Sequence, residues 1–195
     1  MKWIDFERQL RKKGIKLFTP LDARQFFSRS KIAITFLLHR LKKQGRLENI
    51  KRGLYKLTDE QIPEVYIANK LYEPSYVSLE FALSYHRVIP ETVYEITSVT
   101  PKATRRFETM EKIFSYRRIK KAAFTGYAIE KQNGLSFQIA DPDKAFVDTL
   151  YYRILDGQEP LSRFDKNKIN MARALRYAQL FRDDKLISIV KATLQ

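Results

Sequence analysis

Apolar residues near the start of the chain recur at the spacing of a helix. Trp3, Phe6 and Leu10 lie at positions i, i+3 and i+7, which places them on one face. This pattern predicts a first helix over residues 3–13. We expect Gly14 to end it, because glycine readily adopts the left-handed conformation found after many helices.

Two further helices are predicted next, with a short break between them. Residues 19–22, Thr-Pro-Leu-Asp, combine an N-cap, a proline suited to the first helical position and an acid near the positive helix end. They predict a helix over residues 20–27, followed by a break at 28–30 and a third helix over 31–44. The apolar residues of the third helix share one face, which we expect to pack on the first two helices: Ile34, Leu37, Leu38 and Leu41.

A basic β-hairpin is predicted directly after the third helix. Two short runs, residues 47–50 and 54–57, have the composition of strands, and Lys51-Arg52-Gly53 between them forms a turn in which glycine can adopt positive φ. Three helices followed by such a hairpin are typical of a winged helix-turn-helix. In that fold the third helix reads DNA and the hairpin is the wing.

The polar and proline-containing segment at residues 58–63 indicates a linker. We therefore predict a winged helix-turn-helix domain over residues 1–58 and a second domain over residues 62–195.

The second domain mixes helical and strand patterns, which predicts an α+β fold. Its strands are consecutive, which favours a mainly antiparallel sheet, and we expect helices to flank that sheet. The pattern predicts helices over residues 64–71, 78–85, 141–155, 166–181 and 184–193, and strands over residues 93–100, 105–108, 113–118 and 135–140.

The positive charge is concentrated in the first domain. The chain has a net charge of +15, and residues 1–58 hold 16 Lys and Arg against 4 Asp and Glu, a net of +12. Charge spread evenly would suggest a role in solubility. This asymmetry instead favours a polyanionic partner for the first domain, and double-stranded DNA fits the predicted fold.

The strongest candidate site is a set of hydroxyl, apolar and basic residues around the third helix and the hairpin. Short hydroxyls, cations and a helix N-terminus hold phosphates, and the first turn of the third helix is expected to enter the major groove. There Lys31, Ile32 and Thr35 are the candidates for base edges, because Lys reaches guanine acceptors and apolar groups touch thymine methyls. The full set is Ser28, Arg29, Ser30, Lys31, Ile32, Thr35, His39, Lys42, Lys43, Lys51 and Arg52.

The alternative for this set is a solvated amphipathic helix beside a basic loop. Phe36 lies on the same face, and a large aromatic side chain is unfavourable in water. We therefore expect Phe36 to pack on the hairpin or on the second domain, and we do not assign it to DNA.

A second basic run lies on or near adjacent predicted strands of the second domain. Two Arg pairs across these strands would form a positive face for nucleic acid or for an acidic protein. It is equally consistent with the sequence that these cations are ordinary surface charges on strands, paired with nearby Glu residues. Its residues are Arg105, Arg106, Arg117, Arg118, Lys120 and Lys121.

The sequence offers little for catalysis, and we expect no enzyme activity, no catalytic residues, no metal site and no cofactor. Asp141, Asp143 and Asp148 are the candidates for a metal-dependent enzyme acting on nucleic acid. Capping of a helix that starts at Pro142 explains the first two acids more simply. The chain has no Cys, no signal-peptide pattern and no run of about 20 apolar residues, so we expect a cytoplasmic protein that does not contact membranes.

Several segments together resemble the AbiEi antitoxins of type IV toxin-antitoxin systems, which act in abortive infection. Residues 140–148, Ala-Asp-Pro-Asp-Lys-Ala-Phe-Val-Asp, are similar to the family's A-x-P-E-K-A-x-x-D helix start, with Asp143 where the family usually has Glu. The resemblance extends over residues 18 to about 155. The other matching segments are residues 18–22, 45–47, 51–55, 74–83, 89–100, 107–109 and 114–117.

This resemblance implies a transcriptional autorepressor that is also an antitoxin. In the family, the N-terminal domain binds inverted repeats in its own operator, and the C-terminal domain is needed to oppose a nucleotidyltransferase-like toxin. Two alternatives stay open: the metal-dependent enzyme described above, and a basic protein-interaction module without DNA specificity.

Overall fold

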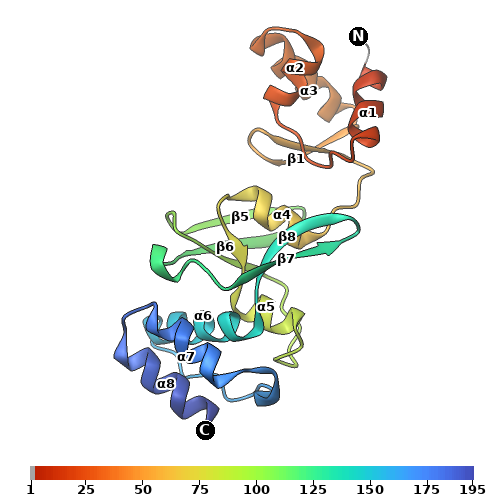
Figure 1. Cartoon of the computed structure of the whole chain (residues 1–195). Helices are drawn as coiled ribbons and strands as arrows, with labels where there is room; N and C mark the ends of the chain where they lie inside the picture. Colours follow the sequence, from red (N-terminus) through yellow and green to blue (C-terminus); the bar gives the residue numbers. More distant parts are fainter. Residues whose placement is uncertain (1–2) are drawn as a thin grey trace. The chain divides into compact units, whose positions relative to one another are not determined.

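The computed structural model describes residues 3–195, which divide into two compact units (Figure 1). The first unit ends at Ile62 and the second spans residues 63–195. Each unit has its own buried core, so each is described separately.

The first unit begins with three helices, α1 (Trp3–Lys12), α2 (Pro20–Phe27) and α3 (Lys31–Lys43). Thr19 caps α2, and Asp22 returns the contact by accepting a hydrogen bond of 2.7 Å from the Thr19 backbone N–H. This reciprocal capping box satisfies two N–H groups that a helix start leaves without partners. It fixes the start of α2 at the residue that the Thr-Pro signal predicts.

A two-stranded antiparallel hairpin follows, made of β1 (Leu47–Lys51) and β2 (Leu54–Leu57). Gly53 in its turn has a φ of +81°, a conformation that glycine adopts without strain. The hairpin is tied back to the helices by two backbone hydrogen bonds of 3.0 and 2.9 Å between Phe18 and Tyr55. This bridge joins the segment before α2 to the second strand.

The core of the first unit gathers the apolar stripes of all three helices and the inner side of the hairpin. These faces bury one another because each helix has one apolar stripe. The expected packing of α3 on the first two helices is confirmed. The buried cluster contains Phe6, Leu10, Phe18, Ala23, Ile34, Leu37, Leu38, Leu41, Leu47 and Leu57.

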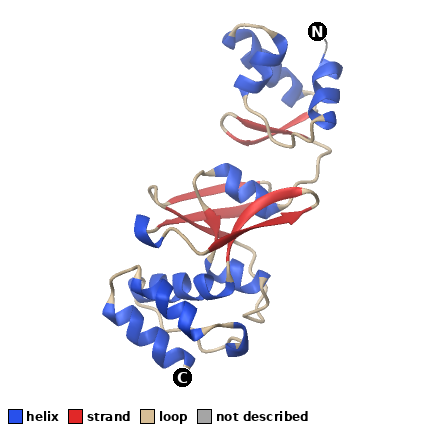
Figure 2. Ribbon diagram, viewed as in Figure 1, coloured by secondary structure: helices blue, strands red, loops and turns tan. Residues whose placement is uncertain are grey.

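The second unit is built on a mixed six-stranded sheet in the order β5-β6-β4-β3-β8-β7 (Figure 2). The pairs β5-β6, β4-β3 and β8-β7 are antiparallel, whereas β6-β4 and β3-β8 are parallel. The strands are β3 (Tyr76–Val77), β4 (Ile96–Thr100), β5 (Arg105–Thr109), β6 (Lys112–Arg118), β7 (Tyr127–Gln132) and β8 (Leu135–Ala140).

The α+β class is confirmed, but the sheet is more mixed than the sequence predicted. Consecutive strands do form hairpins, at β5-β6 and at β7-β8. The short strand β3 was not predicted, and it sits in the middle of the sheet between β4 and β8. Its parallel pairing with β8, and that of β4 with β6, join strands that are not neighbours in sequence, which local patterns do not reveal.

Helices cover both faces of the sheet. Figure 1 shows α4 (Glu64–Leu71) on one face and α5 (Leu79–Tyr85) with α6 (Pro142–Leu155) on the other. The Tyr116 hydroxyl on β6 donates to the Ala68 carbonyl of α4 at 2.5 Å, whereas the Tyr76 hydroxyl on β3 donates to Asp148 of α6. α7 (Met171–Gln179) and α8 (Asp184–Leu194) pack on α6.

The segment predicted as one helix over residues 166–181 is divided. It holds a 3-10 turn at Lys166–Lys168, and α7 begins after Asn170, whose side chain caps it. A second 3-10 turn lies at Lys121–Ala123. Within residues 3–195 there is no helix of the length and apolar character needed to cross a membrane.

Candidate nucleic-acid interface

Helix α3 divides cleanly into a buried and an exposed face. Its four apolar core residues lie on one side, and every residue of this helix that was predicted to bind DNA is exposed on the other. The helix carries no acidic residue. Its 13 residues give it a length of about 20 Å. The exposed selected residues are Lys31, Ile32, Thr35, His39, Lys42 and Lys43.

The start of α3 is held by local hydrogen bonds. Ser30 is its N-cap, and the Ser30 hydroxyl accepts a hydrogen bond of 3.2 Å from the Ala33 N–H. The Thr35 hydroxyl donates to the Lys31 carbonyl at 3.0 Å. Ser28 adopts a left-handed conformation that ends α2, with a φ of +49°. These contacts set the turn between the two helices and leave Arg29 exposed beside the N-terminus of α3.

The hairpin brings the remaining two selected residues to its turn. Lys51 ends β1 and is half-buried, whereas Arg52 is exposed next to Gly53. The Asn49 side chain stabilises the turn by donating to the carbonyls of Lys51 at 2.7 Å and Leu54 at 3.2 Å.

Three of the six acidic residues of the first unit pair with Arg11 or Lys16, which lie outside α3. Arg11 contacts Glu7, Asp59 and Glu60 at 2.7–3.2 Å, and Lys16 contacts Glu60 at 2.6 Å. Within the described part of the chain, by contrast, the cations around α3 make no ion pair or side-chain hydrogen bond. The positive potential of this surface is therefore not neutralised locally. These cations are Arg29, Lys31, Arg40, Lys42, Lys43 and Arg52.

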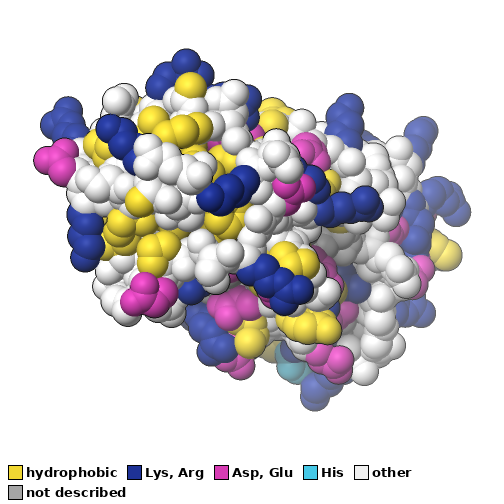
Figure 3. Space-filling model, turned by 90° about the horizontal axis from the view of Figure 1, so that it is seen from below, with side chains coloured by type: hydrophobic (Ala, Val, Ile, Leu, Met, Phe, Trp, Pro, Cys, Tyr) yellow, Lys and Arg dark blue, Asp and Glu magenta, His cyan; other side chains and the backbone are white. Residues whose placement is uncertain are grey.

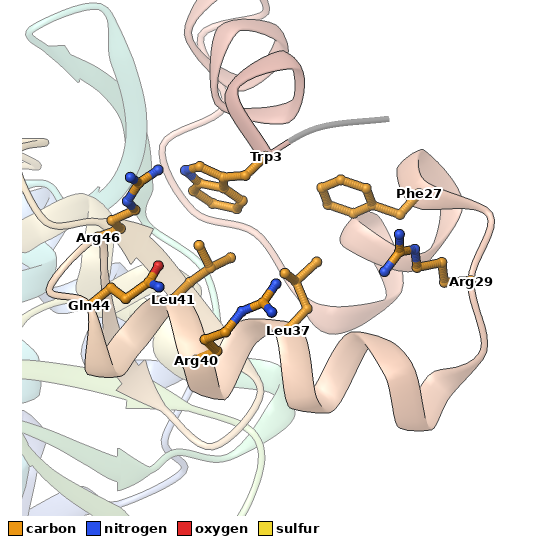
Figure 4. A pocket seen from close by; sticks show the side chains of 8 residues that line it. All are labelled: Trp3, Phe27, Arg29, Leu37, Arg40, Leu41, Gln44 and Arg46. Carbon is orange, nitrogen blue, oxygen red and sulfur yellow. The ribbon is translucent and has the colours of Figure 1, made fainter.

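A cavity of about 350 Å³ lies beside α3 on the side of α1 (Figure 4). Leu37 and Leu41 form its floor, and the rings of Trp3 and Phe27 form its walls. Its edge carries three guanidinium groups, from Arg29, Arg40 and Arg46. Arg40 and Arg46 are exposed cations that were not predicted as site residues, and their position on the same cavity as Arg29 makes them further phosphate-binding candidates.

The second basic run does not form one face. Arg105 pairs with Tyr116 and Arg106 with Ser115, so the Arg pairs are offset rather than opposite one another. Successive strand residues point to opposite sides of a sheet. Arg106 and Arg117 therefore lie on the α6 side, whereas Arg105 and Arg118 lie on the α4 side.

Three of the six side chains of this run already form ion pairs or hydrogen bonds within the protein. Arg117 forms two hydrogen bonds of 2.6 and 2.8 Å to Asp156, which hold the pKa of that carboxyl below its usual range. Arg106 contacts Glu108, and the Lys120 ammonium donates to the Phe181 carbonyl at 2.6 Å.

On the molecular face shown in Figure 3, Lys and Arg side chains are scattered among Asp and Glu and do not merge into one patch. Arg118, Lys120 and Lys121 line one cavity of about 390 Å³.

The three acids considered as metal ligands each bind protein donors instead. Asp141 is the N-cap of α6, accepting from the Lys144 N–H at 2.9 Å, so its predicted capping role is confirmed. Asp143 does not cap α6; it accepts hydrogen bonds of 2.7 Å from the Asn170 N–H and 2.6 Å from Arg173. Among residues 3–195, no group of three or more His, Cys, Asp or Glu is placed to hold a metal ion.

Asp148 belongs to a fully buried polar cluster between α6 and β3. Its two oxygens accept from the Lys144 ammonium, from Ser78 at 2.8 Å and from Tyr76 at 3.1 Å. Burial raises the pKa of Asp148 and lowers the pKa of Lys144, while their mutual contact opposes both shifts. Both side chains are fully buried, so this cluster joins the helix to the sheet rather than facing a substrate.

Sequence comparison assigns no family to the chain. A scan against protein-family models finds no match, and a search of curated proteins finds none either. The arrangement of the residues around α3 therefore carries the functional argument.

One part of the expectation about Phe36 is wrong. Its side chain is 71% exposed on the outward face of α3 and does not pack on the hairpin. The spacing of the core residues of α3 predicts this exposure, because Phe36 lies opposite them on the helix.

Proposed function

We propose that the chain is a DNA-binding transcriptional regulator whose first unit is a winged helix-turn-helix. The observation that carries this proposal is the outward face of α3, which has no acidic residue and whose cations have no ion-pair partners among residues 3–195. A major groove about 12 Å wide admits a helix. The order of three helices and a hairpin tied back through Phe18 and Tyr55 supports the assignment.

In this proposal the two elements have different roles. The N-terminal turn of α3 enters the major groove, where Lys31 and Thr35 reach base edges. The hairpin turn, with Lys51 and Arg52, binds phosphates beside the groove. Phosphate contacts supply affinity without sequence information, whereas base contacts supply specificity.

We further propose autorepression at an operator with inverted repeats, together with an antitoxin role against a nucleotidyltransferase-like toxin. The support is the resemblance of residues 18 to about 155 to the AbiEi antitoxins. An inverted repeat would be bound by two copies of the chain, because operator symmetry mirrors protein symmetry. The second unit would be the part that opposes the toxin.

A gel-shift experiment tests the DNA-binding proposal. The full chain is titrated with the DNA upstream of its own gene and with a shuffled duplex of equal length and composition. We expect tighter binding to the upstream DNA and loss of that preference in the Lys31→Ala/Thr35→Ala variant. A variant that keeps the wild-type preference would show that α3 does not read the sequence.

The antitoxin proposal needs a separate test. The chain is expressed together with a nucleotidyltransferase encoded beside its gene, and growth is compared with and without each partner. Rescue of growth by the full chain is the expected result. If the neighbouring protein is not toxic, or if the chain does not relieve toxicity, the antitoxin proposal fails while the DNA-binding proposal stands.

A further inference from the structure

Two large apolar side chains lie uncovered on the outward face of α3. Ile32 is 70% exposed and Phe36 is 71% exposed. At 100° per residue, Ile32, Phe36, His39 and Lys43 fall within an arc of about 60° opposite the buried stripe. The apolar pair thus occupies the middle of the surface assigned to DNA, not its margin.

The surroundings of the pair restrict what can cover it. Its neighbours on the helix are Lys31, His39 and Lys43, and no acid lies on α3. A partner must therefore offer apolar groups at two points and negative charge around them. A second copy of this surface would bring like charges together, which opposes self-association through it.

The major groove of DNA meets both requirements. The thymine C5-methyl is the apolar group that base edges present there, and phosphates line the groove. Side chains four residues apart on a helix are separated by about 6 Å along its axis, whereas successive bases rise about 3.4 Å. Two apolar side chains with this separation match methyl groups about two base pairs apart.

We infer that Ile32 and Phe36 read thymine methyl groups, so that the DNA site contains two thymines about two base pairs apart. The inference rests on the proposed DNA-binding function and specifies its sequence preference. Phe36 thereby gains a role in specificity, and its exposure is explained by the contact it makes when DNA is bound.

Replacing thymine by uracil isolates the methyl group, because uracil pairs identically. Duplexes are first selected from a randomised pool with the full chain, and each thymine of the selected duplex is then replaced by uracil in turn. We expect a loss of about fourfold in affinity at each of two positions, the value for one buried methyl group.

Three variants locate the contact on the protein. At one of the two positions, Phe36→Ala should bind the duplex with equal affinity whether it carries thymine or uracil there. Ile32→Ala should do the same at one of the two positions. Ile4→Ala, which removes a 58% exposed isoleucine from α1, is the matched control and should keep the wild-type ratio. Thermal unfolding checks that all three fold, as expected for exposed side chains.

The possible outcomes distinguish a failure of the inference from a failure of the proposed DNA-binding function. The inference is overturned, and DNA binding stands, if the wild-type chain binds the thymine and uracil versions of the selected duplex with equal affinity. The same holds if the Phe36→Ala and Ile32→Ala variants keep the wild-type ratio of the two affinities. If no duplex is enriched and none binds, the proposed function fails and the inference with it. If the wild type is a dimer and Phe36→Ala a monomer with an unchanged ratio, the face is a self-association surface and the inference is wrong.

Discussion

At the residue scale, the pair Lys144 and Asp148 shows how the second unit holds charge inside its core. Asp148→Asn removes the charge partner of a buried ammonium, and such a change typically lowers the free energy of unfolding by about 3–5 kcal/mol. Urea denaturation followed by circular dichroism measures this loss.

An exposed pair provides the control for this prediction. Glu108→Gln breaks the contact with Arg106 on the solvent-exposed strand β5, and we expect a change of less than about 1 kcal/mol. Equal losses in the two variants would contradict the role assigned to the buried cluster.

Gly126 and Gly134 form a second residue-scale test, because both have a φ of +77° and differ in their surroundings. A Cβ at Gly126 would lie 2.8 Å from Lys144 Cγ and from the Tyr177 ring, whereas a Cβ at Gly134 would meet nothing within 4 Å. Alanine at Gly134 should cost about 1 kcal/mol of backbone strain. Alanine at Gly126 should cost about 1–3 kcal/mol more, since crowding adds to the strain.

Thermal unfolding of the two glycine variants gives the comparison directly. A lower melting temperature for Gly134→Ala than for Gly126→Ala would contradict the close packing of Gly126 against Lys144 and Tyr177.

At the element scale, the start of α3 depends on its cap. Ser30→Ala removes the acceptor for the Ala33 N–H and should lower the free energy of unfolding of the first unit by about 1 kcal/mol. Ser28→Gly, two residues earlier, should instead raise it slightly, because glycine relieves the left-handed conformation there. Chemical denaturation of both variants tests the prediction, and a loss in Ser28→Gly would contradict it.

Elements with strong local signals were predictable from the sequence. The Thr-Pro start of α2 and the Asp-Pro start of α6 gave the correct first helical residue, Pro20 and Pro142. Strand β7 was missed because it lies at the edge of the sheet and lacks a regular alternation of apolar and polar residues. Asn133-Gly134 after it was the available signal, since both residues adopt positive φ in the turn that joins β7 to β8.

The candidate site was predictable in its composition but not in its spatial grouping. The exposed face of α3 follows from helical periodicity, so the exposure of its residues could be predicted. The division of Arg105 and Arg106 between two faces depends on strand register, which sequence does not show. The placement of Arg46 and Arg29 on one cavity depends on tertiary packing in the same way.

At the scale of the whole molecule, charge is distributed unequally between the two units. The first 62 residues hold 16 Lys and Arg against 6 Asp and Glu, and the remaining 133 hold 21 against 16. In the first unit three of the six acids, Glu7, Asp59 and Glu60, pair with Arg11 or Lys16, and none of the six lies on α3. We therefore propose that DNA binds to the first unit.

The most direct test is the dependence of DNA affinity on salt, measured with the full chain by fluorescence anisotropy. The logarithm of the affinity should fall linearly with the logarithm of the salt concentration. Lys51→Ala/Arg52→Ala should reduce that slope by about 1.8, or about 0.9 for each lost phosphate contact. Arg105→Ala/Lys121→Ala, which removes two exposed cations from the second unit, should leave the slope unchanged. Absence of DNA binding at low salt, or a slope that changes only in the second variant, would contradict the account.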